Sequence, residues 1–81
     1  NDEQMLVFSL YPNPAQTSVS FTFEGVTTAT IELMDLNGKL IATTLNVQSG
    51  DALSIENLEN GVYMILIRTE KGNAIQRLIK Q

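Results

Sequence analysis

The sequence predicts an all-β protein, a sandwich of about seven antiparallel strands with no helix. Apolar and polar residues alternate with a period of two, the alternating runs are short and separated by Gly, Pro, Asn or Asp, and no long stretch repeats its apolar residues at about 3.6-residue spacing. The alternation is clearest over residues 18–24, where Val19, Phe21 and Phe23 share one face and polar residues the other. Short strands at this spacing are typical of two packed sheets.

The strands are expected at about residues 5–10, 18–24, 29–35, 39–47, 52–58, 61–69 and 74–80. The first must end near Tyr11-Pro12-Asn13-Pro14, because the two prolines lack backbone donors and hold the residues before them extended. We expect a rigid corner here, with the Tyr11 ring on the core and its hydroxyl at the rim. The sixth run is apolar at both parities, which predicts a central strand, whereas the mixed seventh run predicts an edge strand.

The turn at Asn37-Gly38 allows two registers for the third and fourth strands. A two-residue loop would place Leu33 opposite Ala42 and split the apolar residues of the fourth strand from those of the third. A three-residue loop, with Gly38 left-handed in a bulge, keeps the apolar residues together, and we predict this loop. Its register pairs Leu33 with Ile41, Ile31 with Thr43 and Ala29 with Leu45.

The same spacing recurs between the last two strands, at residues 69–73. It predicts a left-handed Gly72 and places Ile67 opposite Ile75. A positive backbone φ at each of the two glycines is therefore expected.

The composition excludes several classes of function. The chain has 81 residues, enough for one domain, and no Cys or His, so it lacks disulfides, thiolates and imidazole bases. We therefore expect no enzyme, no cofactor and no small-molecule ligand. A net charge of -4 argues against nucleic-acid binding, which depends on Lys and Arg that neutralise phosphates. The longest apolar run has six residues, against the roughly 20 that a membrane-spanning helix needs.

Three local patterns have a structural interpretation that we favour over a chemical one. Asp35-Leu36-Asn37-Gly38 places oxygen ligands before a Gly, but this Gly comes two residues early for a calcium loop, so we expect a hairpin turn and no metal. The Ser and Thr residues lie mostly at outward positions with no His to activate them. Of the five aromatic residues, Phe21 and Phe23 follow the inward pattern, which favours core over a sugar-binding platform.

Charge is distributed unevenly along the chain. Residues 1–67 contain eight acidic residues and one basic residue, a net charge of -7, whereas residues 68–81 contain four basic residues and one acidic residue, a net charge of +3. Taken alone, the basic end could be an edge strand whose Lys and Arg discourage edge-to-edge pairing.

Four segments together resemble the type A C-terminal sorting domain of the type IX (Por) secretion system of Bacteroidetes-type bacteria. They are Tyr11-Pro12-Asn13-Pro14, Asp35-Leu36-Asn37-Gly38-Lys39, Leu58-Glu59-Asn60-Gly61-Val62-Tyr63 and Gln76-Arg77-Leu78-Ile79-Lys80-Gln81. Each is weak alone, but the four occur in order and at family-like spacing over nearly the whole chain. Gly61 and Tyr63 match the family's Gly-x-Tyr, and Arg77 and Lys80 match its basic last strand, although Gln76 stands where the family often has Lys.

The resemblance implies a seven-stranded immunoglobulin-like sandwich that directs a cargo across the outer membrane. It further implies transit through the periplasm, recognition by translocon and shuttle proteins, and removal at the cell surface by a sortase-like cysteine protease. The residues that we expect to form the sorting motif are Tyr11, Pro12, Asn13, Pro14, Asn37, Gly38, Lys39, Gly61, Tyr63, Arg77, Leu78, Ile79 and Lys80.

Two further expectations concern the setting of the domain. Residues 1–4 are polar, and we expect them to be the end of a linker from a cargo domain, with residues 5–81 forming one sorting domain. We expect a monomer or a weak dimer through edge strands, and recognition through the terminal hairpin by strand addition and charge. The alternative is a carbohydrate-binding or adhesion sandwich attached to a larger secreted enzyme.

Overall fold

The computed structural model describes residues 7–81 and contains seven strands and no helix in that range, as predicted. The strands are β1 (Val7–Tyr11), β2 (Ser18–Glu24), β3 (Ala29–Asp35), β4 (Leu40–Val47), β5 (Ala52–Ser54), β6 (Gly61–Thr69) and β7 (Gly72–Lys80). Residues 5 and 6 of the expected first strand lie outside the described residues. The described chain thus has no helix that could cross a membrane.

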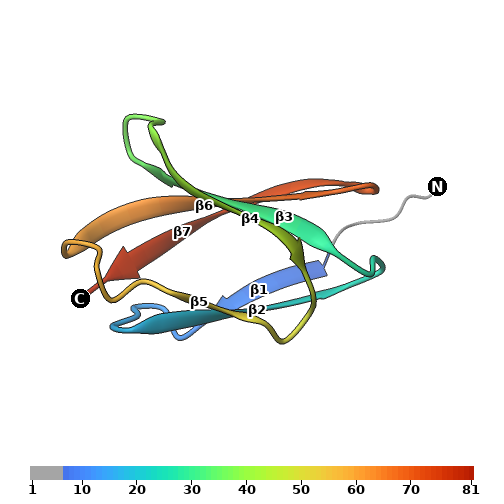
Figure 1. The fold of residues 1–81 in the computed structure, drawn as a ribbon, viewed down its shortest axis with the longest axis horizontal. Coiled ribbons are helices and arrows are strands. Elements are labelled where there is room, and N and C mark those ends of the chain that lie inside the picture. Colours follow the sequence, from blue (N-terminus) through green and yellow to red (C-terminus); the bar gives the residue numbers. More distant parts are fainter. Residues whose placement is uncertain (1–6) are drawn as a thin grey trace.

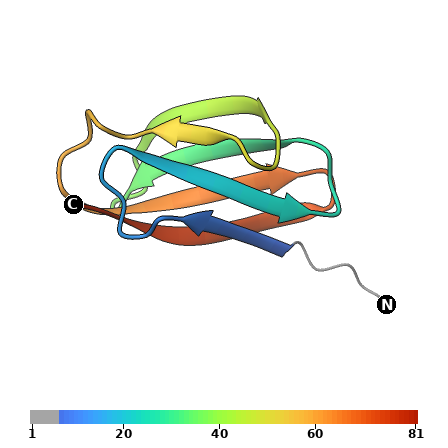
Figure 2. The same ribbon diagram turned by 90° about the horizontal axis from the view of Figure 1, so that it is seen from below.

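The strands form two antiparallel sheets that pack face to face (Figures 1 and 2). One sheet has the order β1-β2-β5 and the other the order β4-β3-β6-β7. This is an immunoglobulin-like sandwich, in which the chain crosses repeatedly between the sheets. The central position predicted for the sixth strand and the edge position predicted for the seventh are both confirmed.

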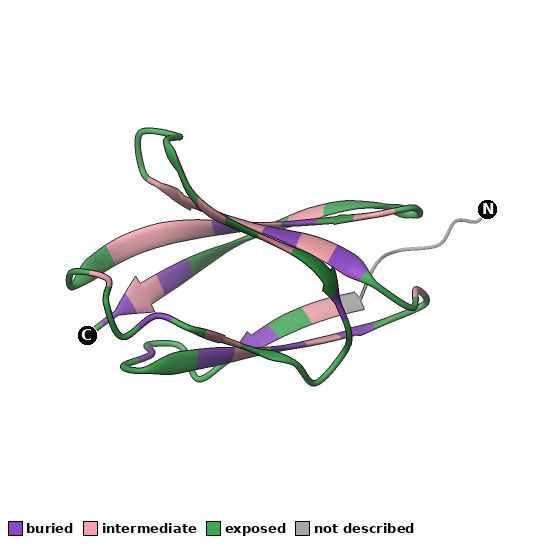
Figure 3. Cartoon of the chain, viewed as in Figure 1, coloured by how far each residue is buried: buried purple, intermediate pink, exposed green. Residues whose placement is uncertain are grey.

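The core lies between the sheets, where the inward residues of alternate positions meet (Figure 3). The strand β2 illustrates the pattern, because Val19, Phe21 and Phe23 are buried and the residues between them are more exposed. Phe8 stacks on Phe21 with ring centroids 6.5 Å apart. The fifth strand ends at Ser54 and not near residue 58 as predicted, because the chain then turns inward to bury Ile55 and cross to the other sheet.

The register predicted for β3 and β4 is wrong beyond the turn itself. The turn has the predicted three-residue loop: the Asp35 carbonyl accepts from the Gly38 amide at 3.0 Å, the Asp35 amide donates to the Lys39 carbonyl at 3.0 Å, and Gly38 has a φ of 86°. Beyond the Met34–Leu40 pair, however, the register shifts, so that Leu33 lies opposite Ala42. The reason is an extra residue in β4, which a period-two pattern cannot reveal.

A second shift follows near the end of β4. The pairing moves from Ile31–Thr44 to Ala29–Val47, and Asn46 there has a φ of 58°. The extra residue changes which positions of the strand face the core, so that Leu45 is 67% exposed whereas Val47, two residues later, is buried.

The last hairpin also has a register other than the predicted one. Gly72 has the expected positive φ, 135°, but the loop has two residues and Ile67 lies opposite Ala74 instead of Ile75. This register turns Leu78 into the core, whereas the predicted one would have turned Arg77 inward. Burying an apolar side chain in place of a charged one accounts for the preference.

Candidate functional site

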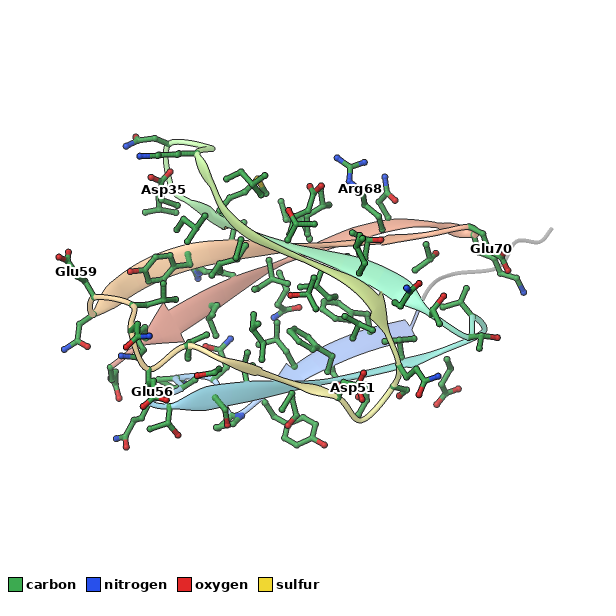
Figure 4. The ribbon with its side chains drawn as sticks, viewed as in Figure 1. Asp35, Asp51, Glu56, Glu59, Arg68 and Glu70 are labelled. Atoms are coloured by element: carbon green, nitrogen blue, oxygen red, sulfur yellow. The ribbon has the colours of Figure 1, made fainter. Side chains whose placement is uncertain are left out.

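The four sequence segments meet at one end of the sandwich, which we call the motif end. It consists of the corner at residues 11–15, the β3–β4 turn at residues 35–39, the loop at residues 58–60 and the last residues of β7. In Figure 1 the β3–β4 turn, the start of β6 and the C-terminus all lie at the left. Figure 4 shows Asp35 and Glu59 at this end, far from Arg68 and Glu70. The strand pairing agrees with this placement, because Asp35 of the second segment lies opposite Tyr63 of the third.

The corner between β1 and β2 lies along the outer edge of β7. The Asn13 side chain accepts a hydrogen bond from the Ile79 amide at 3.0 Å and donates one to the Arg77 carbonyl at 2.8 Å. Next to it, the Ala15 amide donates to the Ile79 carbonyl at 2.8 Å, and the Ala15 carbonyl accepts from the Gln81 amide at 2.8 Å. The corner therefore closes this stretch of the edge to strand addition.

The loop at residues 58–60 is held by two motif side chains. The Lys80 ammonium donates to the Leu58 carbonyl at 3.0 Å, and the Tyr63 hydroxyl donates to the Glu59 carbonyl at 2.6 Å. Lys80 is only 7% exposed, and Gly61 at the start of β6 lies opposite it. These contacts join the third and fourth segments into one unit.

The β3–β4 turn projects from the motif end with its tip exposed. The Asp35 carboxylate oxygen Oδ1 accepts from the amides of Asn37 and Lys39, both at 2.9 Å. Asn37, Gly38 and Lys39 are all exposed. Asp35 thus organises the turn from within, which is the role expected of an Asx turn and needs no metal.

Two expectations about exposure are wrong. Tyr11 does not pack on the core but is 52% exposed, because its position opposite Ser20 turns it toward the outer face of the three-stranded sheet. Lys80 does not contribute to a basic surface but is buried, because it shares the inward parity of Leu78. The sequence pattern missed the cap that Asn13 forms, since contacts between residues 13 and 79 leave no local signal.

The terminal strand therefore divides its motif residues between two faces. Leu78 and Lys80 point into the sandwich, whereas Arg77 is exposed and Ile79 is partly exposed on the outer face. Of the other basic residues in the last hairpin, Arg68 pairs with Glu32 at 3.3 Å. The inward residues hold the motif end together, and the outward residues are available to a partner.

The chemistry available at the motif end is that of recognition. Among the described residues, no cluster of three or more Asp, Glu, His or Cys could hold a metal ion. An open pocket of about 350 Å³ lies beside the corner, with Pro12, Pro14 and Gln81 in its lining. Its lining offers amide, hydroxyl and proline groups, which suit contact with another surface better than acid or base chemistry.

The comparisons with known proteins identify the family of the chain. Residues 9–81 match a family model described as a secretion system C-terminal sorting domain. The match includes all four segments that meet at the motif end. None of the curated proteins matches the chain.

Proposed function

The chain belongs to the family of C-terminal sorting domains of the type IX secretion system. We propose that the secretion machinery recognises the domain through its C-terminal hairpin, β6 and β7. Domains of this family are sorting signals, and the family is not one of enzymes. They interact with the type IX machinery, and a protein that carries such a tail is secreted to the outer membrane or the cell surface.

The observation that carries this proposal is the convergence of the corner at residues 11–15 and the loop at residues 58–60 on the end of β7, with the β3–β4 turn beside them at the same end. Asn13, Ala15 and Tyr63 each contact β7 or the loop that β7 holds, so the rest of the fold fixes the position of the terminal strand. A rigidly presented strand binds a partner with less loss of conformational entropy than a mobile one. The outward side chains Arg77 and Ile79 are then the part of the terminal segment that a receptor contacts.

The remaining steps of the proposed route concern the partners. The cargo with its sorting domain crosses the periplasm, is engaged by translocon and shuttle proteins, and reaches the cell surface, where a sortase-like cysteine protease removes the domain. The protease belongs to the machinery, since this chain contains no Cys. The domain contributes a recognised surface and no chemistry of its own.

A reporter fused in front of residues 1–81 tests the function in a type IX-competent cell. We expect the fusion to reach the cell surface and a version without residues 78–81 to stay inside. That deletion also removes the buried Leu78 and Lys80, so circular dichroism of the purified domain must accompany it. The double variant Arg77→Ser with Ile79→Ser alters only outward side chains of the strand and should lose export while it stays folded. Full export of both altered fusions would refute recognition through the hairpin.

The second candidate function is a carbohydrate-binding or adhesion module, and the exposure of Tyr11 favours it. An aromatic ring that is 52% exposed can pack on the apolar face of a sugar. Titration of the domain against a glycan panel separates the two functions, because a sorting domain should bind none of the glycans. Binding that disappears in Tyr11→Ala would support the module instead.

A further inference from the structure

The outer face of the four-stranded sheet carries an apolar surface beside the Arg68–Glu32 ion pair, and we call this surface the outer patch. Its residues are Met34, Val62, Met64, Leu66, Ile75 and Ile79. The register makes them neighbours: Met34 lies opposite Met64, Leu66 opposite Ile75 and Val62 opposite Ile79. Ile75 is 57% exposed, and Leu40, which is 52% exposed, continues the patch from its place opposite Met34.

The opposite outer face of the sandwich has a different chemistry. On the three-stranded sheet, Ser18, Ser20 and Thr22 point outward, and the hydroxyls of Ser9 and Thr22 are 2.8 Å apart in a hydrogen bond. An antiparallel sheet that faces water normally carries such polar residues. Strand β6, by contrast, is apolar on both faces over residues 62–67, which is typical of a strand covered on both sides. The fold itself covers only the inner side.

One motif residue, Arg77, lies within the outer patch. It is exposed, it stands between Ile75 and Ile79 on its own strand, and it lies opposite Met64. Arg is one of the residue types that most often dominate binding energy in protein interfaces, and both Met and Arg are enriched there. No carboxylate among the described residues pairs with Arg77, although one pairs with Arg68. A partner would therefore supply the negative charge.

We propose that the outer patch is the docking face for a folded receptor protein whose surface is apolar and carries a carboxylate opposite Arg77. This inference rests on the proposed function and specifies how the hairpin is read: through the face of the sheet and not by strand addition at the end of β7. The edge there is closed, because Asn13 and Ala15 already bond the Arg77 carbonyl, the amide and carbonyl of Ile79, and the Gln81 amide. On the face of the sheet, Ile75 and Arg77 are exposed and the other side chains of the outer patch are partly exposed.

Two other occupants fit the outer patch less well. A second copy docked face to face would supply another Arg77 and, among the described residues, no free carboxylate for it, because Glu32 of this face already pairs with Arg68. A membrane surface gains about 1 kcal/mol for each Lys or Arg near anionic lipid, so the outer patch with Arg77 would be held weakly. A protein with complementary charge satisfies both the apolar surface and the Arg.

Charge reversal within and outside the outer patch tests the inference on the reporter fusion. Arg77→Glu and Lys71→Glu change the net charge equally, and both residues are exposed on the last hairpin, but only Arg77 lies within the patch. We expect Arg77→Glu to lower surface display at least tenfold and Lys71→Glu less than twofold, with unchanged thermal midpoints for both purified domains. Equal display of the two variants, with the unaltered fusion exported, would overturn the inference and the role of Arg77, but would leave the domain's function as an export signal intact. Failure of the unaltered fusion to be exported would refute the function itself.

Site-specific photo-crosslinking identifies the occupant directly. A photoreactive side chain at Ile75 in the exported fusion should form an adduct with a type IX protein, and the same side chain at Ser20, on the polar outer face, should form none. Mass spectrometry of the adduct identifies the crosslinked partner. An adduct with a second copy of the fusion, or with lipid, would overturn the inference in favour of that occupant.

Discussion

Replacing Asn13 by Ala tests whether the corner between β1 and β2 stabilises the terminal strand. The substitution removes both hydrogen bonds of the side-chain amide, to the Ile79 amide and the Arg77 carbonyl, and leaves the backbone bonds of Ala15 in place. The bonds join residues that are 64 and 66 positions apart in the sequence. Their loss should therefore destabilise the folded domain with little effect on the unfolded chain.

The expected loss follows from the number of bonds and the exposure of the site. Each neutral hydrogen bond contributes about 0.5–1.5 kcal/mol, and water can reach this exposed edge, so we expect a loss of about 1–2 kcal/mol in the free energy of unfolding. A domain of this size has a total stability of roughly 4–12 kcal/mol. Since about 1 kcal/mol shifts the midpoint of a small domain by roughly 4–8 °C, the thermal midpoint should fall by about 4–16 °C.

Urea and thermal unfolding followed by circular dichroism measure this loss. Asn13→Asp keeps an acceptor for the Ile79 amide but loses the donor to the Arg77 carbonyl, so it should fall between the Ala variant and the unaltered domain. Asn73→Ala is the matched control, an exposed Asn on the outward side of the same strand. If Asn13→Ala and Asn73→Ala differ by less than about 0.3 kcal/mol, the corner does not stabilise β7 and the reasoning is wrong.

Three other substitutions test separate parts of the fold, each by urea unfolding. Leu78→Ala should cost about 2–5 kcal/mol because Leu78 is fully buried, whereas Ile75→Ala on the same strand should cost far less; equal costs would contradict the assigned register. Gly38→Ala should cost about 1–2 kcal/mol through its φ of 86° alone, since no atom lies within 4 Å of an added Cβ, and a neutral result would argue against the left-handed turn. Tyr63→Phe should cost about 0.5–1.5 kcal/mol by removing the hydrogen bond to the Glu59 carbonyl. An unchanged free energy of unfolding would indicate that the hydroxyl bonds to water instead.

The sequence was sufficient to predict the strands, the inward face of β2 and the central position of β6 in its sheet. Alternation marks the inward residues of β2, and apolar residues at both parities mark β6 as central, because each signal is carried by the residues of one strand. The register of β4 could not be predicted in this way. Its pairing depends on extra residues near Ile41 and Asn46, and any residue type can occupy most bulge positions.

The candidate site was predicted as a set of segments and not as an arrangement. Resemblance to the family gave the segments, but their meeting at one end is a product of topology. The burial of Lys80 followed from the register of the last hairpin, which the turn pattern predicted wrongly by one residue. The cap by Asn13 depends on tertiary contacts between distant residues, and a single sequence contains no signal for such contacts.

The outer edge of β4 is a poor template for extending the sheet into a second copy of the domain. Between the irregularities near Ile41 and Asn46, the free side of this strand is regular only from residue 42 to residue 45. A neighbouring molecule laid against it would lose alignment after a few residues, so templated growth of the kind that produces fibrils stops there. The two bulges of β4 thus protect this edge of the four-stranded sheet against pairing with another sheet.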